Sequence, residues 1–291
     1  MQRLAVAAER VRHSVKARAE IPDFTDRSDE IGHLSRALRD MTSALYNRID
    51  AIESFAADVA HELKNPLTSL RSATETLPLV RDKKSRERLM DIIQHDVKRL
   101  DRLISDISDA SRLDAELARE DARPVDLDDL LRATVSLYRD IHRDDLPELS
   151  LDIDRAPGVY PYRVMGHDSR LHQVMVNLIE NAISFSPPRG LVTVTARRRG
   201  PEVEVAIEDE GPGIAPENLE RIFERFYTDR PHETFGQNSG LGLNISRQII
   251  AAHGGRLYAE NRPVPEGKAS TADGRARSSG GARFVIRLKA A

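Results

Sequence analysis

The chain has 291 residues, of which 40% are hydrophobic and none is cysteine, and it carries 44 Lys and Arg against 47 Asp and Glu. This near balance of charge argues against a nucleic-acid-binding protein, and the absence of cysteine excludes disulfides and thiolate zinc sites. We expect a soluble protein of two or three domains without membrane contact, because no apolar run reaches the roughly 18 residues of a membrane span.

The first 48 residues predict two helices joined by an extended connector. Residues 18–28 interrupt a helical pattern, and Asp29-Glu30-Ile31-Gly32 opens a second helix. The first helix is indicated by Leu4, Ala8, Val11 and Val15. This order of elements resembles a HAMP relay domain, a dimeric four-helix unit of bacterial receptors, and a simple coiled-coil hairpin is the alternative. The chain opens inside a helical pattern without a cap, so we expect a fragment of a longer protein.

The apolar seam of the second helix continues far beyond residue 48 in alternating steps of three and four, as in a coiled coil. Its members are Ile31, Leu34, Leu38, Met41, Leu45, Ile49, Ile52, Ala56, Val59 and Leu63. Two successive steps of four, from Met41 to Ile49, form a stutter that shifts the phase of the coil. Our hypothesis is that this junction transmits helix movement along the chain.

The stretch His61-Glu62-Leu63-Lys64-Asn65-Pro66 lies within this predicted helix. A histidine accepts a phosphoryl group when one ring nitrogen is unprotonated and exposed, and Glu62 is placed to hold the proton of the other nitrogen. Asn65 follows His61 by one turn on the same face, whereas Pro66 removes a backbone donor and should bend the helix. A solvated histidine beside an ordinary glutamate is the alternative for this stretch taken alone.

A second long helix is predicted after a charged turn at residues 81–86. Its apolar face consists of Leu89, Ile93, Leu100, Leu103 and Ile107. Two long helices separated by a short turn form an antiparallel hairpin. Because a lone hairpin leaves its apolar stripe uncovered, we expect residues 49–117 to form half of a dimeric four-helix bundle.

The pattern changes near a charged linker at residues 119–124, and residues 118–291 predict a mixed sheet covered by helices. The expected strands are 125–127, 149–153, 162–165, 191–197, 202–208, 255–260 and 283–288. The expected helices are 128–142, 168–185, 216–224 and 241–252. Asp168 or Ser169 should cap the second of these helices. Residues 262–282, rich in Pro, Gly and Ser, predict a flexible loop.

Three stretches in this half are candidates for a nucleotide site. Asn177 and Asn181 lie four residues apart on an otherwise apolar helix and need polar partners, which Mg²⁺ and phosphates would supply. The stretch 209–213, Asp-Glu-Gly-Pro-Gly, offers a carboxylate for an adenine amino group and glycines for close backbone approach. The stretch 239–243, Ser-Gly-Leu-Gly-Leu, opens a helix whose N-terminus attracts phosphate. Each stretch alone is also compatible with an ordinary turn or a capping residue.

In this order and spacing, the stretches resemble the motifs of bacterial two-component sensor histidine kinases, over essentially the whole chain. Residues 61–66 resemble the H box of that family, and 177–182 resemble the N box. The first glycine box corresponds to 209–213, the F box to Phe223-Glu224-Arg225-Phe226-Tyr227, and the second glycine box to 240–242.

The resemblance implies that residues 118–291 adopt a Bergerat-type ATP-binding fold, an α/β sandwich with a mobile lid at 214–239. It implies that Asn181 coordinates Mg²⁺, that Asn177 supports the phosphates and that Asp209 recognises adenine. The other nucleotide contacts that it implies are Gly211, Gly213, Phe226, Gly240, Leu241 and Gly242.

The chain departs from the pattern of this family in two places. Ser184 stands where the family often has a basic residue, so a phosphate or ribose contact is missing or is supplied by Arg189, Arg225 or Arg230. Asn238 stands where glycine is common, and asparagine tolerates left-handed backbone better than most residues.

The function implied by the resemblance is that of a sensor histidine kinase. His61 would take the γ-phosphoryl group of Mg-ATP with Glu62 as base, and an aspartate of a response regulator would then receive it. Asn65 would orient water for dephosphorylating that regulator. We expect a homodimer on the cytoplasmic side of the bacterial inner membrane, with a membrane-anchored parent similar to alphaproteobacterial envelope- or acid-sensing kinases. A chaperone- or topoisomerase-like ATPase and a non-catalytic signalling scaffold are the alternatives.

Overall fold

The computed structural model describes residues 21–24, 27, 29–117, 121–140, 146–154, 162–228, 239–263 and 280–291. The chain divides into two compact units, residues 1–68 and 69–291. Within the described ranges, no helix combines the length and the apolar character needed to cross a bilayer. The helix predicted near residues 4–15 lies outside the described residues.

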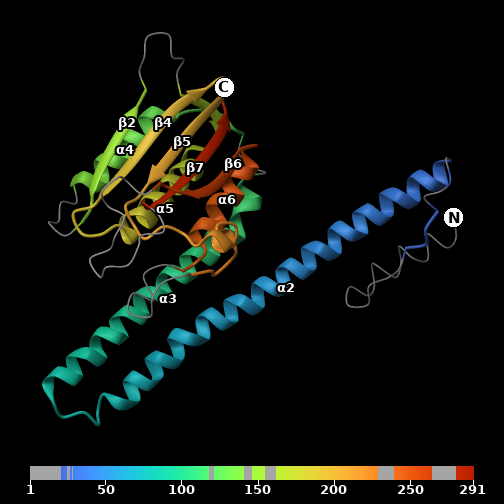
Figure 1. The fold of residues 1–291 in the computed structure, drawn as a ribbon. Helices are drawn as coiled ribbons and strands as arrows, with labels where there is room; N and C mark the ends of the chain where they lie inside the picture. The colour runs from blue at the N-terminus through green and yellow to red at the C-terminus, as the bar shows by residue number, and fades with distance from the viewer. Residues whose placement is uncertain are drawn as a thin grey trace. The chain divides into compact units, whose positions relative to one another are not determined.

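The first unit contains an extended connector and most of helix α2 (Glu30–Thr76), drawn in blue in Figure 1. Asp29 starts this helix because its carboxylate accepts a hydrogen bond of 3.1 Å from the backbone N–H three residues later. The buried hydroxyl of Ser35 fastens the connector to the helix. It accepts from the Phe24 N–H at 3.2 Å and donates to the Pro22 carbonyl at 3.0 Å.

Helix α2 is one continuous helix, as the apolar seam predicts, and it continues through Pro66. Bending at this proline stays a prediction. Four members of the seam, Leu34, Met41, Leu45 and Ile52, are between 42% and 62% exposed in the single chain. A regularly spaced apolar face of this kind is typical of a helix that packs against a second helix in a coiled coil.

The second unit begins with the end of α2 and with helix α3 (Lys83–Leu117). The charged turn predicted at 81–86 is wrong in its position, since α3 already begins at Lys83. Asp82 explains the early start, because its carboxylate accepts a hydrogen bond of 2.8 Å from the Ser85 N–H and so caps the helix.

The remainder of this unit is built on strands at the places where the sequence predicts them. They are β1 (Arg123–Asp126), β2 (Glu148–Ile153), β3 (Arg163–Gly166), β4 (Leu191–Arg199), β5 (Glu202–Glu208), β6 (Arg256–Asn261) and β7 (Ala282–Lys289). A five-stranded sheet has the order β2-β4-β5-β7-β6, in which β2 and β4 are parallel and the other neighbours are antiparallel. Strands β1 and β3 form a separate antiparallel pair. The predicted mixed sheet is confirmed.

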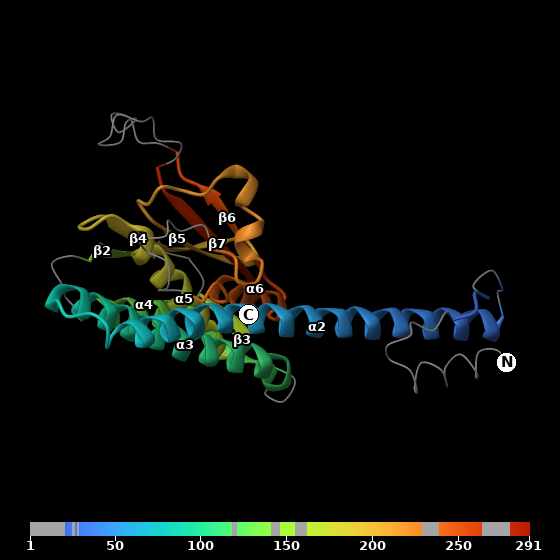
Figure 2. The same ribbon diagram turned by 90° about the horizontal axis from the view of Figure 1, so that it is seen from below.

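Helices α4 (Leu127–Asp140), α5 (Asp168–Phe185) and α6 (Gly242–Ala252) cover one face of this sheet, and the two views in Figure 1 and Figure 2 agree on the arrangement. Alternate residues of the strands point into the core between sheet and helices, because successive side chains of a strand face opposite ways. Fully buried core residues include Leu131, Leu171, Met175, Leu178, Ile207, Ile245 and Ile249. The unit is therefore a two-layer α/β sandwich.

Two local predictions in this unit are wrong. The helix expected at 216–224 is a pair of short 3₁₀ turns, η1 (Pro216–Asn218) and η2 (Arg221–Phe223). Neither Asp168 nor Ser169 caps α5, because the cap position is His167 and it makes no side-chain capping bond. The His167 backbone N–H instead donates to the ring of His253 at 3.0 Å.

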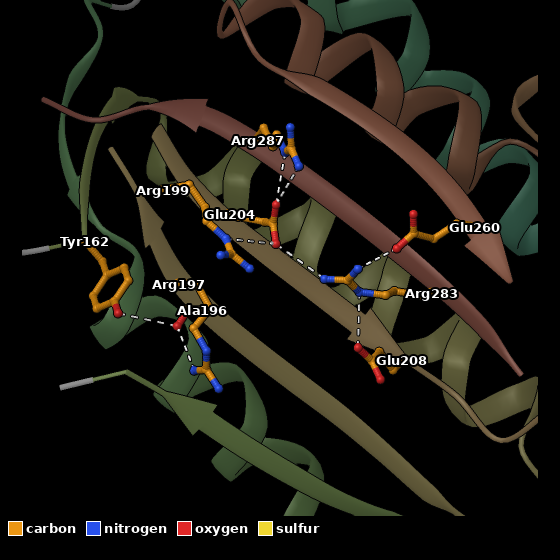
Figure 3. A network of polar contacts seen from close by, with 9 residues as sticks. All are labelled: Tyr162, Ala196, Arg197, Arg199, Glu204, Glu208, Glu260, Arg283 and Arg287. Carbon is orange, nitrogen blue, oxygen red and sulfur yellow. Dashed lines mark hydrogen bonds and ion pairs between the residues drawn. The ribbon is translucent and has the colours of Figure 1, made fainter. Parts of the chain in front are cut away.

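The other face of the sheet carries a network of ion pairs (Figure 3). Glu204 on β5 lies at its centre with a side chain only 6% exposed, and it contacts Arg287 at 2.9 Å and Arg283 at 3.3 Å on β7. Arg283 also pairs with Glu208 at 3.1 Å. In the register of the sheet, Glu204 lies opposite Arg287 and Glu208 lies opposite Arg283, so the pairing follows from the antiparallel alignment.

Candidate functional site

The predicted phosphoacceptor stretch lies on α2 in the first unit. The side chains of His61 and Asn65 are exposed, and that of Glu62 is partly exposed. His61 and Asn65 are four residues apart in one helix and therefore project from the same face. An exposed imidazole with an unprotonated ring nitrogen is able to attack a phosphoryl group.

The second unit contains a cavity of about 220 Å³. Six predicted site residues line it, namely Asn177, Asn181, Asp209, Gly213, Gly240 and Gly242. Apolar side chains also reach it, from Phe185, Ile214, Ile222, Leu243 and Phe284. A cavity with apolar walls and a few convergent polar groups is typical of a site for an organic ligand.

The Asp209 side chain is held at the end of β5 by the backbone of the following turn and by the start of β7. Its Oδ1 atom accepts hydrogen bonds from the Gly211 N–H at 2.9 Å and from the Ala282 N–H at 3.0 Å. The residue is only 3% exposed, and burial raises the pKa of this carboxyl although the two backbone donors oppose the shift. Among the described residues no hydrogen bond reaches Oδ2, which leaves that oxygen available for a ligand donor.

The turn before α6 is fixed by glycine. Gly240 has φ +73°, and a Cβ there would lie 2.7 Å from the Phe226 backbone. The Phe226 N–H donates to the Gly240 carbonyl at 2.9 Å, so the end of the F box lies directly against the second glycine box. The turn leads into the N-terminus of α6, where backbone N–H groups and the helix dipole favour an anion.

Asn177 and Asn181 lie one turn apart on α5 and both line the cavity. Asn177 connects α5 to α6, because its amide group donates to the Gly242 carbonyl and to the Ser246 hydroxyl, each at 3.3 Å. In the described part of the chain no hydrogen bond involves the side-chain amide of Asn181. Its oxygen is therefore suited to a hard cation such as Mg²⁺, which prefers oxygen ligands and retains several waters.

Helix α3 contributes two cavity residues that the sequence analysis does not predict. Arg102 and Asp106 line the cavity together with Glu180 of α5. Asp106 is hydrogen-bonded to the Ser239 side chain, and burial raises the pKa of its carboxyl. A further contact joins the Gln173 amide to the Asp109 carboxylate at 2.9 Å. In the sequence these α3 residues are typical of a solvated helix face, so only the tertiary contact reveals them.

Several residues with predicted roles are not part of the cavity lining. Gly211 instead allows a close approach, because a Cβ there would lie 2.8 Å from the Phe185 carbonyl oxygen. Leu241 is buried in the core at 1% exposure, and Phe226 supports the glycine turn from outside the lining. The cavity-lining residues do not include Arg189 or Arg225. The predictions about Arg230 and Asn238 lie outside the described residues.

Two protein-family models match the chain. Residues 51–116 match the His Kinase A (phospho-acceptor) domain, and residues 166–291 match the histidine kinase-, DNA gyrase B- and HSP90-like ATPase. The first match contains His61, and the second contains every residue predicted to contact the nucleotide.

The sensor protein ChvG of Rhizobium meliloti (strain 1021) is 58% identical over 296 residues, which cover all of this chain and 49% of that protein. The signal transduction histidine-protein kinase/phosphatase MprB of Mycolicibacterium paratuberculosis (strain ATCC BAA-968 / K-10) is 34% identical over 276 residues, which cover 91% of this chain and 50% of that protein. The chain thus spans about half the length of the curated relatives it matches.

Among solved structures, histidine kinase ThkA in complex with response regulator protein TrrA matches with a TM-score of 0.63. The two chains are 25% identical, and the match covers 84% of this chain and 64% of the other. A helical region followed by an α/β sheet domain is common to both chains, as predicted. The family models and the relatives bear out the resemblance that the five sequence motifs indicate. The chain belongs to the two-component sensor histidine kinases.

Proposed function

We propose that this chain transfers the γ-phosphoryl group of ATP to His61 and from there to an aspartate of a response regulator. The observation that carries this proposal is the combination of two features in one chain. The first is an exposed histidine on α2 within a phosphoacceptor-domain match, and the second is a cavity lined by Asp209, two asparagines and a glycine turn. Both features are needed for a kinase that phosphorylates itself.

Each part of the nucleotide has a suitable group in the cavity. The available Oδ2 of Asp209 accepts a hydrogen bond from the adenine 6-amino group, and apolar side chains such as Ile214 and Ile222 pack against the base. The N-terminus of α6, with Gly240 and Gly242, receives the triphosphate. The buried Leu241 has no direct role in this arrangement and supports the turn from the core.

The cavity also fits a magnesium ion bound with the nucleotide. Asn181 supplies an amide oxygen, and Glu180 lines the same cavity and is able to hold coordinated water. When bound, such an ion neutralises part of the negative charge on the phosphate oxygens. Asn177 keeps α5 and α6 at a fixed separation through Gly242 and Ser246, and this positions both helices around the phosphates.

The reaction exchanges one bond to phosphorus for another. A ring nitrogen of neutral His61 forms the new bond as the bond from phosphorus to the oxygen of the β-phosphate breaks, and ADP leaves. Glu62 accepts a hydrogen bond from the N–H of the other ring nitrogen and so stabilises the positive charge that develops on the ring. Positioning of the two reactants supplies most of the rate enhancement.

The proposed domain organisation follows from the same observations. Residues 1–48 form a HAMP relay domain, which agrees with an extended connector fastened to α2 by Ser35. Residues 49–117 form the dimerisation and phosphotransfer hairpin, and 118–291 form the ATP-binding domain. A homodimer covers the apolar seam of α2, of which Met41 and Ile52 are 62% and 59% exposed in one chain.

The partner is a response regulator, which docks beside His61. A kinase of the same fold is complexed with such a regulator, and a relative is described as both kinase and phosphatase. We assign the phosphatase step to Asn65, whose exposed amide lies one turn from His61 and orients the attacking water. The relatives are sensor proteins about twice as long as this chain, so we place it on the cytoplasmic side of the inner membrane in a membrane-anchored parent.

The test is incubation of the chain with ATP labelled at the γ-phosphate, followed by detection of labelled protein. Wild type should become labelled in an acid-labile and alkali-stable form, whereas His61→Gln should bind ATP with unchanged affinity and remain unlabelled. Release of labelled inorganic phosphate without any protein-bound label would favour a chaperone-like ATPase instead. Binding of ATP without transfer or release of label would favour a non-catalytic scaffold.

A further inference from the structure

Arg262 is not one of the cavity-lining residues, but it contacts the main chain of Asp209, whose carboxylate lines the cavity. It follows directly after β6, and its Nη1 atom donates to the main-chain carbonyl of Asp209 at 2.8 Å. Its Nε atom lies 3.1 Å from the Glu208 carboxylate, and its side chain is 26% exposed. One side chain thus contacts both residues at the point where β5 ends and the cavity begins.

The backbone of Arg262 is fixed as well as its side chain. Its N–H donates to the Gly281 carbonyl at 2.9 Å, and its carbonyl accepts from the Gly280 N–H at 3.0 Å. Gly281 has φ +124°, and a Cβ at that position would lie 1.9 Å from the Asp209 carbonyl oxygen. The absence of a side chain at 281 therefore keeps the Asp209 carbonyl accessible to the guanidinium group.

Asp209 consequently has little freedom to move. One carboxylate oxygen is held by two backbone N–H groups, its own N–H donates to the Ala282 carbonyl at 3.0 Å, and Arg262 holds its carbonyl. A hydrogen-bond acceptor discriminates between ligands only when its direction is fixed. Arg262 acts on the one main-chain group of Asp209 that no strand partner holds in the described structure.

We propose that Arg262 is a positioning residue that gives the cavity its selectivity for an amino-bearing purine. It fixes the Asp209 main chain so that the available carboxylate oxygen faces the 6-amino group of adenine. This inference rests on the proposed function, since it requires Asp209 to accept a hydrogen bond from the base. Arg262 is not among the residues that line the cavity, so it acts through Asp209.

The network on the open face of the sheet extends this support. Glu208, which pairs with Arg262, also pairs with Arg283 at 3.1 Å, and Arg283 contacts the buried Glu204 (Figure 3). The guanidinium of Arg262 is thereby the link between the ion pairs of β5 and β7 and the Asp209 backbone. Because Glu208 has two cationic partners, Arg262 is not needed merely to neutralise it.

The chain offers a matched control at Arg197 on β4. This arginine also donates to a main-chain carbonyl, that of Asp152 at 3.0 Å, and it pairs with the carboxylate of the same residue. Its side chain is 31% exposed, close to the value for Arg262, and it lies on the same face of the sheet. Arg197 has no contact with Asp209, so its replacement tests the loss of an equivalent surface bond without the effect on the cavity.

The experiment measures the dissociation constants of the whole chain for ATP and for inosine triphosphate, whose base carries an oxygen in place of the 6-amino group. Wild type should prefer ATP strongly, because an oxygen facing a carboxylate is repelled. In Arg262→Gln the preference should fall by about tenfold, roughly the value of one directed hydrogen bond to a charged group. Binding of inosine triphosphate should change little, and Arg197→Gln should keep the wild-type ratio.

A folded Arg262→Gln protein with the wild-type ratio overturns the proposal, and so does an equal loss of affinity for both nucleotides. If Arg262→Gln fails to fold, Arg262→Lys serves in its place, since it keeps the charge but has one donor nitrogen instead of the two that make these contacts, and its ratio should be intermediate. The variant Asp209→Asn distinguishes failure of the Arg262 proposal from failure of the proposed adenine site. If wild type binds ATP and inosine triphosphate with the same affinity, and Asp209→Asn does so too, Asp209 does not recognise the 6-amino group of adenine, whatever the role of Arg262.

Discussion

The backbone N–H of Phe226 donates to the carbonyl of Gly240 at 2.9 Å, and the left-handed Gly240 presents its Cα directly to the Phe226 backbone. This contact joins Phe226, which lies within the proposed lid at 214–239, to Gly240, the residue that follows the lid. The turn at the start of α6, to which we assign the phosphates, therefore depends on the position of the F box. A substitution at either residue should therefore change the affinity for the triphosphate.

Replacement of Gly240 tests this dependence. Gly240→Ala places a Cβ 2.7 Å from the Phe226 Cα at a φ of +73°, so the turn must move, and we expect the affinity for ATP to fall more than about tenfold. The control is Gly200→Ala, where φ is +60° but nothing lies within 4 Å of the added atom. This variant should lose about 1 kcal/mol of stability and keep its ATP affinity. Calorimetric titration and urea unfolding of both variants measure the two effects, and unchanged ATP binding by Gly240→Ala would contradict the prediction.

A second prediction concerns the carboxylate that α3 contributes to the cavity. Asp106 lines the cavity in which we propose that the triphosphate binds, and an ionised carboxylate there would repel the nucleotide. Asp106→Asn should therefore bind ATP about two- to fivefold more tightly, for a change near 1 kcal/mol or less. Because the pKa of Asp106 is raised by burial, wild type becomes neutral earlier on acidification than an ordinary aspartate. The difference between wild type and variant should shrink as the pH falls.

The matched control for Asp106 is Asp109→Asn. Asp109 lies on the same helix and accepts a hydrogen bond from Gln173 at 2.9 Å, but it is not among the cavity-lining residues. Its replacement should leave ATP affinity within about twofold of wild type. Weaker binding by Asp106→Asn would mean that the carboxylate helps to hold the turn through Ser239 rather than opposing the ligand.

The sequence predicts long elements well because their apolar periodicity is strong. Helix α5 ends at Phe185 as its pattern predicts and begins at Asp168, one of the two residues predicted to cap it, and β5 matches its predicted range of 202–208. The helix expected at 216–224 is wrong for a tertiary reason. Phe223 is held by α6, where Asn244 donates to its carbonyl at 2.7 Å and Arg247 lies 4.8 Å from its ring centre. These contacts determine the path of the chain, and no local pattern contains them.

The residues of the site also divide into those that local sequence patterns predict and those that only tertiary contacts reveal. Motif residues such as Asn177 and Asp209 are predictable because their spacing and glycine neighbours are local properties. Arg102 and Asp106 lie on α3, more than 60 residues before Asn177 in the sequence. Arg262 follows a strand, and in the sequence it is indistinguishable from an ordinary charged residue. Each is recognised only from a contact between segments that are distant in sequence. Leu241 lies inside a motif, but its side chain is buried in the core, which the motif alone does not indicate.

A third prediction uses the contact between His167, at the start of α5, and His253, at the end of α6. His253 Nδ1 lies 2.7 Å from the Ile249 carbonyl, and its Nε2 accepts from the His167 N–H at 3.0 Å, so the ring is bound in its neutral form. Burial lowers the pKa of His253 below its usual value, and the neighbouring His167 ring acts in the same direction. A Cβ at Gly166 would lie 2.5 Å from the His253 ring, which leaves it little room to turn away.

The sign follows from proton binding. Below about pH 6.5 the unfolded chain protonates this histidine while the folded chain does not, so the free energy of unfolding decreases as the pH falls toward the lowered folded pKa. The contribution is fully present above about pH 6.5. In His253→Gln this part of the pH dependence should vanish, and the difference in unfolding free energy between wild type and variant should narrow from pH 7.5 to pH 5. A difference that stays constant over this range would contradict the prediction.

The last prediction concerns the buried glutamate of the open sheet face. Glu204 has a side chain 6% exposed, whereas its partners Arg287, Arg283 and Arg199 are 45%, 29% and 63% exposed. Removing a buried charge partner is costly, but these arginines can turn to water, so Glu204→Gln should lose about 1–2 kcal/mol in urea unfolding rather than the larger loss of a fully buried pair.

Arg199→Ala, which removes the contact at 3.8 Å, should lose less than about 0.5 kcal/mol. A double-mutant cycle with Arg287→Gln should give a favourable coupling of about 1 kcal/mol, and a coupling of zero would show that packing, not charge, keeps Glu204 in place.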